Sequence, residues 1–313
     1  MNVVFLDAAT LPRALAFAAP AIAYTAYAST APEQVAGRIA GAAVVITNKV
    51  RLTATDIAGA AGLRLIAVAA AGTDNIDKEA AAGYGIRVQN VPDYGSDSVA
   101  EHVIATLFAL RRQVLEYAAA AVDGRWSASP HFCWSGPPIE DLGGSTLGIV
   151  GRGRIGEAVA RLARGLGMEV LFAQAPGRDC RADELPLAEL LVRADALTLH
   201  VPLTAASRNM IDQAALQGMK RNAVLVNTGR GALVDPGALA QALRDGIIAG
   251  AAIDVLETEP PAPDHPLLDR TIPNLLVTPH VAWASRKAQA KLAATLEALV
   301  DETLTGDGGA HPA

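Results

Sequence analysis

Residues 147–156 read Leu147-Gly148-Ile149-Val150-Gly151-Arg152-Gly153-Arg154-Ile155-Gly156, and they are the strongest indication of the fold in the sequence. It begins as an apolar strand, turns through the spacing Gly-x-Gly-x-x-Gly and enters a helix predicted over residues 157–166. In such a turn Gly151 permits the tight bend, Gly153 lets the backbone approach a pyrophosphate, and Gly156 lets the helix pack closely on the strand. An ordinary glycine-rich turn is the alternative. The flanking strand and helix favour a dinucleotide-binding turn instead.

Short apolar runs recur along the chain between segments of helical periodicity. They are residues 3–6, 44–46, 65–68, 147–150, 170–172, 197–199, 224–226, 251–253 and 275–277. Each run is continuously apolar rather than alternating, as expected for parallel strands that helices cover on both faces. The alternation of strand and helix therefore predicts an α/β fold built on doubly wound parallel sheets.

A length of 313 residues suits two domains, because single cores usually stop growing below that size. The glycine-rich turn comes only after several strand and helix units, which indicates a dinucleotide-binding domain inserted into a second domain. We place the inserted domain at residues 100–285 and the second domain at residues 1–99 plus 286–313, with a cleft between them. Residues 99–122 are predicted to form one long helix that connects the domains and serves as a dimer arm. The end of the chain, residues 306–313, is expected to be frayed.

The composition narrows the function classes. Hydrophobic residues make up 51% of the chain and charged residues 19%, which is typical of a folded globular protein. The formal net charge of −6 offers no polycationic surface, so we expect no nucleic-acid partner. The two cysteines, Cys133 and Cys180, provide neither a disulfide framework nor the spacing of a zinc site. The N-terminus lacks the basic start of a secretory signal and the apolar stretches are too short to cross a bilayer, so a cytoplasmic protein is expected.

The strand predicted at residues 170–172 bears on the choice of cofactor. Shortly after it, where an Asp or Glu normally accepts the hydroxyls of the adenosine ribose, the chain has Gln174. Without that carboxylate a 2′-phosphate is no longer repelled, and Arg178 lies close enough in the sequence to meet one, as NADP requires. In the other interpretation Gln174 hydrogen-bonds the ribose of NAD and Arg178 is solvated. The sequence leaves both cofactors open.

Polar residues follow several of the later strands. They are His200, Asn227, Asp254 and His280. Because ligands of open parallel sheets bind outside the carboxyl ends of the strands, we expect these side chains to gather at one site.

Four segments together resemble the D-isomer-specific 2-hydroxyacid dehydrogenase family, and the resemblance runs from the first strand to the C-terminal helix. The segments are Ala71-Gly72-Thr73-Asp74-Asn75-Ile76-Asp77, the glycine turn, Asn227-Thr228-Gly229-Arg230-Gly231-Ala232-Leu233-Val234-Asp235, and Asp254-Val255-Leu256-Glu257-Thr258-Glu259-Pro260 followed by Thr278-Pro279-His280. The resemblance implies a Rossmann NAD(P)-binding domain inserted in a flavodoxin-like substrate-binding domain. It also implies a homodimer and hydride transfer between NAD(P)H and C2 of a small 2-keto or 2-hydroxy acid.

By this resemblance Arg230, Glu259 and His280 are the catalytic residues. Reduction of a 2-keto acid needs a proton at the developing alkoxide, and a histidine such as His280 can supply it. A carboxylate beside it, here Glu259, favours the imidazolium form and fixes the orientation of the ring. The guanidinium of Arg230 matches a carboxylate bidentately and polarises the neighbouring carbonyl. Each residue alone has a structural interpretation, as a packed histidine, a turn residue or one arm of a salt bridge, but their joint occurrence favours catalysis.

The resemblance also implies which residues contact the cofactor and the substrate. The cofactor contacts are Gly151, Gly153, Arg154, Ile155, Gly156, Gln174, His200, Val201, Pro202, Thr228, Gly229, Asp254 and Ala282. The substrate contacts are Asn48, Ala71, Gly72 and Thr73, together with Arg230 and His280. The backbone N–H groups of residues 71–73 are expected to form a nest for the substrate carboxylate. No metal is expected.

Two loops resemble the glycerate dehydrogenase and hydroxypyruvate reductase branch of the family. They are Asn48-Lys49-Val50 and Ser129-Pro130-His131-Phe132-Cys133-Trp134. Both favour hydroxypyruvate or glyoxylate as substrate, reduced to D-glycerate or glycolate, and a plain loop interpretation of both stays open. The alternatives are 3-phosphoglycerate or another D-2-hydroxyacid as substrate, and a non-catalytic NAD-sensing scaffold. We interpret His102, His131, His265 and His311 as structural.

Overall fold

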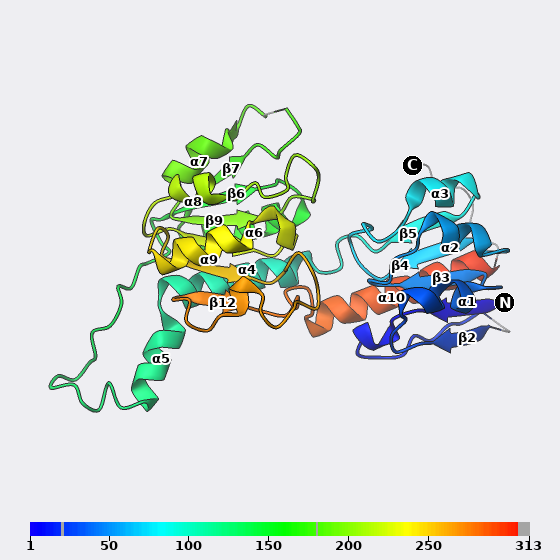
Figure 1. Cartoon of the computed structure of the whole chain (residues 1–313), viewed down its shortest axis with the longest axis horizontal. Helices are drawn as coiled ribbons and strands as arrows, with labels where there is room; N and C mark the ends of the chain where they lie inside the picture. The colour runs from blue at the N-terminus through cyan, green and yellow to red at the C-terminus, as the bar shows by residue number, and fades with distance from the viewer. Residues whose placement is uncertain (20–21, 180, 306–313) are drawn as a thin grey trace. The chain divides into compact units, whose positions relative to one another are not determined.

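The computed structural model describes residues 1–19, 22–179 and 181–305, so Cys180, His311 and the predicted frayed end lie outside the described residues. The chain divides into two units, which Figure 1 shows. One unit combines Met1–Gly95 with the C-terminal segment that begins at Ala284, and the other is Ser96–Trp283. The divisions lie a few residues before the boundaries predicted from the sequence.

The unit Ser96–Trp283 is built on a seven-stranded sheet in which every neighbouring pair is parallel. In spatial order the strands are β12 (Leu275–Val277), β11 (Gly250–Ile253), β10 (Val224–Asn227), β9 (Ala196–Leu199), β6 (Thr146–Val150), β7 (Glu169–Ala173) and β8 (Glu184–Leu185). The chain order reverses between β6 and β9. Ligands of open α/β sheets bind outside the strand ends at such a switch point.

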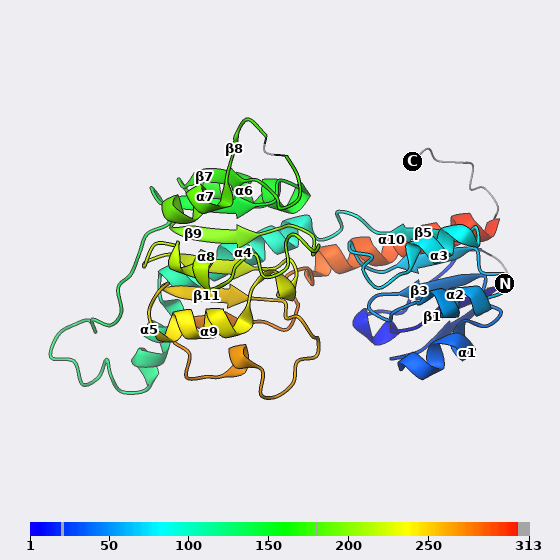
Figure 2. The same cartoon turned by 45° about the horizontal axis from the view of Figure 1, so that its top comes forward.

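Helices cover both faces of this sheet, as the rotated view in Figure 2 helps to follow. The helices of one face are α4 (Ser96–Arg111) and α6 (Arg154–Gly165), and those of the other are α7 (Leu187–Arg193), α8 (Gln213–Gln217) and α9 (Pro236–Arg244). Along β6, Leu147 and Ile149 join the core under α4 and α6, whereas Val150 joins the opposite core. This two-sided burial explains why the strand is continuously apolar.

The other unit has a five-stranded parallel sheet. Its spatial order is β2 (Ala23–Ala26), β1 (Asn2–Phe5), β3 (Val44–Thr47), β4 (Leu65–Val68) and β5 (Arg87–Asn90). The helices are α1 (Val35–Ile39), α2 (Ala54–Gly59) and α3 (Lys78–Gly83), which share one core cluster, and α10 (Arg286–Thr305), which contacts β4. The strand order 2-1-3-4-5 is that of flavodoxin-like sheets. The fold is therefore α/β with a Rossmann unit inserted in a flavodoxin-like unit, as predicted.

Short 3₁₀ helices complete the secondary structure. They are Ala8–Thr10, Pro32–Gln34, Gly231–Leu233 and Pro266–Leu268. No helix among residues 1–19, 22–179 and 181–305 is both long and apolar enough to span a membrane.

The prediction of one helix over residues 99–122 is wrong, because the helix is interrupted between α4 and α5 (Val114–Val122). Gln113 adopts the left-handed conformation, with φ of 53°, which no helix can continue. Just before the break, the guanidinium of Arg111 donates to the backbone carbonyls of Asp195 and Asp141, at 3.1 and 2.9 Å, and anchors the end of α4. No glycine or proline marks the break, so the apolar periodicity concealed it.

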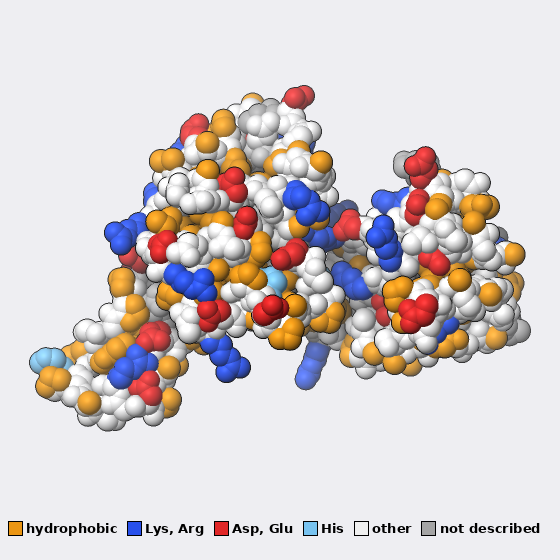
Figure 3. Space-filling model, in the orientation of Figure 1, with side chains coloured by type: hydrophobic (Ala, Val, Ile, Leu, Met, Phe, Trp, Pro, Cys, Tyr) orange, Lys and Arg blue, Asp and Glu red, His pale blue; other side chains and the backbone are white. Residues whose placement is uncertain are grey.

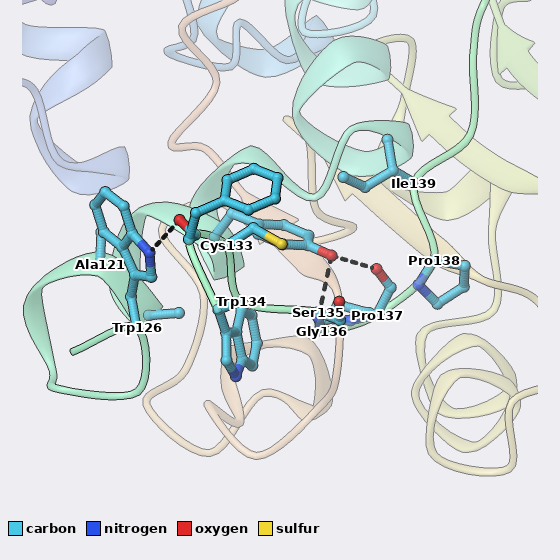
Figure 4. Close-up of a pocket in the computed structure, with 12 residues that line it drawn as sticks. Ala121, Trp126, Cys133, Trp134, Ser135, Gly136, Pro137, Pro138 and Ile139 are labelled. Atoms are coloured by element: carbon cyan, nitrogen blue, oxygen red, sulfur yellow. Dashed lines mark hydrogen bonds between the residues drawn. The ribbon is translucent and has the colours of Figure 1, made fainter. Parts of the chain in front are cut away.

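Helix α5 and the loop that returns from it form an arm, residues 114–140, which extends away from the sheet in Figure 1. A hollow of about 670 Å³ lies in the arm, and Figure 4 shows Trp126 and Trp134 on its wall. The Trp126 indole donates to the carbonyl of Phe132 at 3.0 Å. The Tyr117 hydroxyl donates to the carbonyl of Pro137 at 3.0 Å and accepts from the N–H of Gly136. These bonds hold the return loop against α5.

Candidate active site

The glycine turn joins β6 to α6 at the switch point of the sheet. Gly151 has φ of +102°, and a Cβ there would lie 2.4 Å from the carbonyl oxygen of His200, at the end of the neighbouring strand. A Cβ on Gly156 would lie 2.1 Å from the carbonyl oxygen of Gly151. A Cβ on Gly153 would meet nothing within 4 Å. Gly151 and Gly156 are thus required by protein packing, whereas Gly153 faces open space at the start of the helix.

Several polar groups around this turn have no hydrogen-bond partner among the residues that the structure describes. The N–H groups of Gly153 and Ile155 make no hydrogen bond among the residues that the structure describes, and Gly153 gives α6 no side-chain cap. The hydroxyl of Thr228, just beyond β10, is buried and has no hydrogen-bond partner in the described part of the chain. A helix N-terminus with open N–H groups attracts an anion such as a pyrophosphate, and a buried unpartnered hydroxyl calls for a ligand. These groups fit a bound dinucleotide.

Three other predicted cofactor residues, two at the start of α6 and one on the turn after β10, differ in their exposure. Arg154 is exposed at the first position of α6, and Ile155 is half-buried against the core under α4 and α6. Gly229 packs closely, since a Cβ there would lie 3.1 Å from the carbonyl oxygen of Leu199.

The segment after β9 starts at His200, whose N–H donates to the carbonyl of Val150 at 2.7 Å. The Nε2 atom of His200 lies 3.0 Å from the hydroxyl of Thr198. Burial lowers the pKa of His200 to about 3, so its ring is neutral at pH 7. Val201 is buried in the core, whereas Pro202 is exposed and its carbonyl accepts from Ser207. A neutral ring and an exposed proline can line a nucleotide site, but the Val201 side chain is directed into the core.

At the end of β7 the side-chain amide of Gln174 donates to the carbonyl of Arg178. The guanidinium of Arg178 donates to both carboxylate oxygens of Glu184, each at 2.7 Å. Arg178 is therefore paired with a carboxylate, a state that neither sequence interpretation included. Glu184 belongs to β8, which the sequence did not predict.

The loop that carries His280 is organised by Asp254, which follows β11 and is only 3% exposed. One oxygen of the Asp254 carboxylate accepts from the hydroxyl of Thr278 and the N–H of Val281, and the other accepts from the N–H of Ala282 at 2.9 Å. The backbone N–H of His280 donates to the carbonyl of Asp254 at 2.8 Å. Both predicted cofactor residues, Asp254 and Ala282, are thus buried and hydrogen-bonded to the protein.

His280 and Glu259 lie side by side although 21 residues separate them in sequence. The Nδ1 atom of His280 is 2.6 Å from Oε2 of Glu259, and the two side chains are 26% and 33% exposed. Because a carboxylate only accepts, Nδ1 carries the proton of this bond. The other carboxylate oxygen of Glu259 accepts from the N–H of Leu256 at 2.9 Å. Within the described parts of the chain Nε2 of His280 makes no hydrogen bond, so it is available to a ligand.

Arg230 is half-buried on the turn that follows β10. The buried side chain of Asn227 holds this turn, since its amide donates to the carbonyl of Arg230 and its oxygen accepts from the N–H of Gly229. The next residue, Gly231, packs against the loop of Glu259, because a Cβ on Gly231 would lie 1.9 Å from the carbonyl carbon of Leu256. The close packing at Gly231 brings the loops of Arg230 and Glu259 together.

The predicted substrate residues Asn48 and Ala71–Thr73 belong to the five-stranded unit. Asn48 is buried, and its N–H donates to the carboxylate of Asp7 at 2.8 Å. Asp7, which follows β1, also accepts from the N–H groups of Lys49 and Val50 and so fixes the loop. In contrast, the N–H groups of residues 71–73 make no hydrogen bond within residues 1–19, 22–179 and 181–305. Three consecutive open N–H groups are what an anion nest requires.

Sequence reasoning missed the roles of Asp7, Gly231 and Glu184. Asp7 was visible as the first charge after the first apolar run, which is a signal that the same logic of polar residues at strand ends could have used. The roles of Gly231 and Glu184 depend on contacts between loops and strands that no local pattern encodes. In the described ranges no three or more His, Cys, Asp or Glu side chains cluster as metal ligands would.

Residues 104–282 match the family described as D-isomer specific 2-hydroxyacid dehydrogenase, NAD binding domain. A glycerate dehydrogenase of Methylorubrum extorquens is 45% identical over 306 residues, which cover 97% of this chain and 96% of that protein. Among solved structures, the TT0316 protein of Thermus thermophilus superposes with a TM-score of 0.84 at 35% identity, covering 98% of this chain and 97% of that one. A D-lactate dehydrogenase of Aquifex aeolicus, complexed with NAD and lactic acid, has a TM-score of 0.81 at 26% identity, covering 98% and 96%.

Proposed function

Because this chain belongs to the D-isomer specific 2-hydroxyacid dehydrogenase family, we propose that it reduces hydroxypyruvate to D-glycerate at the site of His280, Glu259 and Arg230. The observation that carries the proposal is the 2.6 Å contact between His280 and Glu259, which leaves Nε2 of the ring available. Bound NADH or NADPH supplies the hydride to C2. The open N–H groups at the start of α6 and the buried hydroxyl of Thr228 support the binding of a dinucleotide to the unit Ser96–Trp283.

His280 acts as the proton donor in this proposal. Hydride addition at C2 places negative charge on the carbonyl oxygen, and Nε2 of His280 donates a proton to that oxygen. Glu259 accepts from Nδ1, fixes the ring and stabilises the imidazolium that must give up this proton. In the oxidation of the hydroxy acid the same atom takes the proton back.

Arg230 binds the substrate in this proposal. Its guanidinium presents paired N–H donors that match a carboxylate, and it polarises the carbonyl before the hydride arrives. The turn held by Asn227 and the packing at Gly231 keep Arg230 in the same cluster of loops as Glu259. In the five-stranded unit, the open N–H groups of residues 71–73 form a nest of the kind that binds a carboxylate.

Hydroxypyruvate is the favoured substrate because of the glycerate dehydrogenase of Methylorubrum extorquens, whose likeness covers nearly the whole length of both chains. Oxidation of D-glycerate at C2 gives hydroxypyruvate, so the names glycerate dehydrogenase and hydroxypyruvate reductase describe one reaction in opposite directions. Glyoxylate is the second expected substrate, since it offers the same carboxylate beside a carbonyl.

The test is the initial rate of NADH and of NADPH oxidation with hydroxypyruvate, glyoxylate, pyruvate and phosphohydroxypyruvate. We expect the highest kcat/KM for hydroxypyruvate, within the usual enzyme range of about 10⁴–10⁸ M⁻¹s⁻¹. A higher kcat/KM for phosphohydroxypyruvate than for hydroxypyruvate would show that the phosphorylated acid is the preferred substrate. A folded protein that binds the nucleotide but reduces none of the four acids would be a nucleotide-binding scaffold instead.

A homodimer formed through the arm is also part of the proposal. The arm exposes several large apolar side chains, and Figure 3 shows hydrophobic surface across it. They are Val114, Leu115, Val122, Trp126, Phe132 and Ile139, with Val122 86% and Phe132 93% exposed. Contiguous apolar surface on a folded protein favours association. Light scattering should give twice the mass of one chain, and the mass of a single chain would contradict this expectation. The cytoplasmic location remains a prediction from the sequence.

A further inference from the structure

Two arginines lie around the end of β7, and carboxylates already pair with both. Arg178 donates to both oxygens of Glu184. Arg152, from the glycine turn, lies over the ring of Phe172 and pairs with Glu157 and Asp183. Between residues 174 and 184 the chain carries Arg178 and Arg181 but three carboxylates, Asp179, Asp183 and Glu184. This region therefore offers no excess of positive charge.

The pairing of β8 with β7 places Glu184 beside the end of β7. Glu184 lies opposite Phe172 in the parallel pairing of β7 with β8, and the N–H of Gln174 donates to the carbonyl of Leu185 at 2.9 Å. The side chain of Glu184 is 0% exposed, whereas that of Arg178 is 36% exposed. Burial acts to raise the pKa of Glu184, but the hydrogen bonds from Arg178 and from the N–H of Arg181 outweigh it and lower the pKa. Glu184 is thus a fixed negative charge at neutral pH, and Arg178 is held by it.

In dinucleotide-binding folds the residue that follows this strand meets the 2′ position of the adenosine ribose. NAD has a hydroxyl there and NADP a phosphate. Gln174 is neutral and repels neither. An arginine whose charge a buried carboxylate already compensates attracts a phosphate much less than an unpaired one does, because the phosphate must approach both charges.

We propose that Glu184 is a specificity-determining residue that makes this protein prefer NADH over NADPH by occupying Arg178. The inference rests on the proposed nucleotide site, and it decides between the two cofactors that the sequence left open. Glu184 does not touch the nucleotide; it acts through Arg178. Removal of its charge should free Arg178 to donate to a 2′-phosphate.

The experiment measures dissociation constants of NADH and NADPH from nicotinamide fluorescence, without any keto acid, for the wild type and three variants. In Glu184→Gln the carboxylate becomes an amide of the same size, so the contact with Arg178 can persist without the charge. Arg178→Gln, alone and combined with Glu184→Gln, removes the guanidinium. The matched control is Asp269→Asn, which removes the carboxylate of another arginine pair, with Arg244 at 2.6 Å.

We expect the wild type to bind NADH at least about tenfold more tightly than NADPH, and Glu184→Gln to tighten NADPH binding about tenfold, the worth of one charge-assisted hydrogen bond. Competition by adenosine 2′-monophosphate against NADH should strengthen in parallel. The double variant should lose the gain, and Asp269→Asn should show none. If Glu184→Gln fails to fold, Arg178→Gln alone tests the inference. Because Glu184 already compensates the charge of Arg178, the loss of this arginine should change the dissociation constant of NADPH by less than about twofold.

The inference is overturned if the wild type binds NADPH as tightly as NADH, if Glu184→Gln leaves the ratio of the two constants unchanged, or if Arg178→Gln alone weakens NADPH binding about tenfold. If neither nucleotide binds, the nucleotide site is wrong and the inference fails with it. If NADH binds but no keto acid is reduced, the proposed reaction is wrong, whereas the inference about Glu184 still stands or falls on the two dissociation constants.

Discussion

Replacement of His280 by glutamine is expected to lower kcat for hydroxypyruvate reduction by about 10³-fold, with KM for hydroxypyruvate changed far less. A positioned proton donor contributes about 10²- to 10⁴-fold to such a reaction, and glutamine keeps a hydrogen-bonding side chain but cannot transfer the proton. The contact of 2.6 Å between Nδ1 and Glu259 leaves Nε2 as the atom that is proposed to donate to the substrate oxygen. The measurement is steady-state kinetics with saturating NADH.

The chain contains a matched control for this variant. His265 also lies beside a glutamate, with Nε2 3.1 Å from a carboxylate oxygen of Glu257, but its side chain is only 7% exposed and its Nδ1 accepts from the N–H of Leu267. His265→Gln should therefore keep kcat within about threefold of the wild type, because no ring nitrogen is left for a proton transfer. Glu259→Gln should lower kcat less than His280→Gln does, since it removes only the residue that orients the ring. Equal losses in His280→Gln and His265→Gln would show that the first loss is structural.

Replacement of Arg230 by glutamine is expected to lower kcat/KM by about 10²- to 10³-fold, mainly through KM. Loss of one partner of a hydrogen-bonded charge pair costs about 2–5 kcal/mol, and each step of about 1.4 kcal/mol is a factor of ten. Arg230→Lys should recover only part of the loss, because lysine restores the charge but not the planar pair of donors. The comparison requires kinetics of all three proteins with hydroxypyruvate.

The affinity for NADH serves as the control for Arg230. The affinity for NADH should change by less than about twofold in both variants, because the proposed role of Arg230 is to bind the keto acid. Two results would contradict the assignment. One is full activity of Arg230→Lys, and the other is a loss of NADH affinity as large as the loss of kcat/KM.

The sequence predicted every central strand and one edge strand, β12, but not the other edge strands, and burial explains the difference. All nine predicted runs are strands. Among the residues that the structure describes, three further strands had no prediction, and β2, β5 and β8 each lie at the edge of a sheet. An edge strand has a neighbour on one side only. The strands β2 and β5 contain no buried residue, and β8 has two residues, so none of the three shows a continuous apolar run.

The site was predictable in part for a similar reason. Parallel strands end at one edge of a sheet, so polar residues after β9, β10 and β11 had to gather there, and the glycine spacing marked the switch point. The pairing of His280 with Glu259 could not follow from spacing, because both lie on loops, and only the family resemblance suggested it. Local patterns do not encode the turn at Gln113, the contact of Gly231 with Leu256 or the pairing of Arg178 with Glu184. Each of them depends on elements that meet only in the folded chain.

The most direct test of hydride transfer to C2 uses NADH that carries deuterium at both C4 positions, with hydroxypyruvate as substrate and mass spectrometry of the product. The account predicts glycerate with one deuterium, located at C2. With Arg230→Gln at a hydroxypyruvate concentration well below KM, it predicts about 10²- to 10³-fold less of the same labelled glycerate in the same brief incubation. Glycerate that forms without deuterium at C2, or the absence of glycerate from a folded protein that binds NADH, would contradict it.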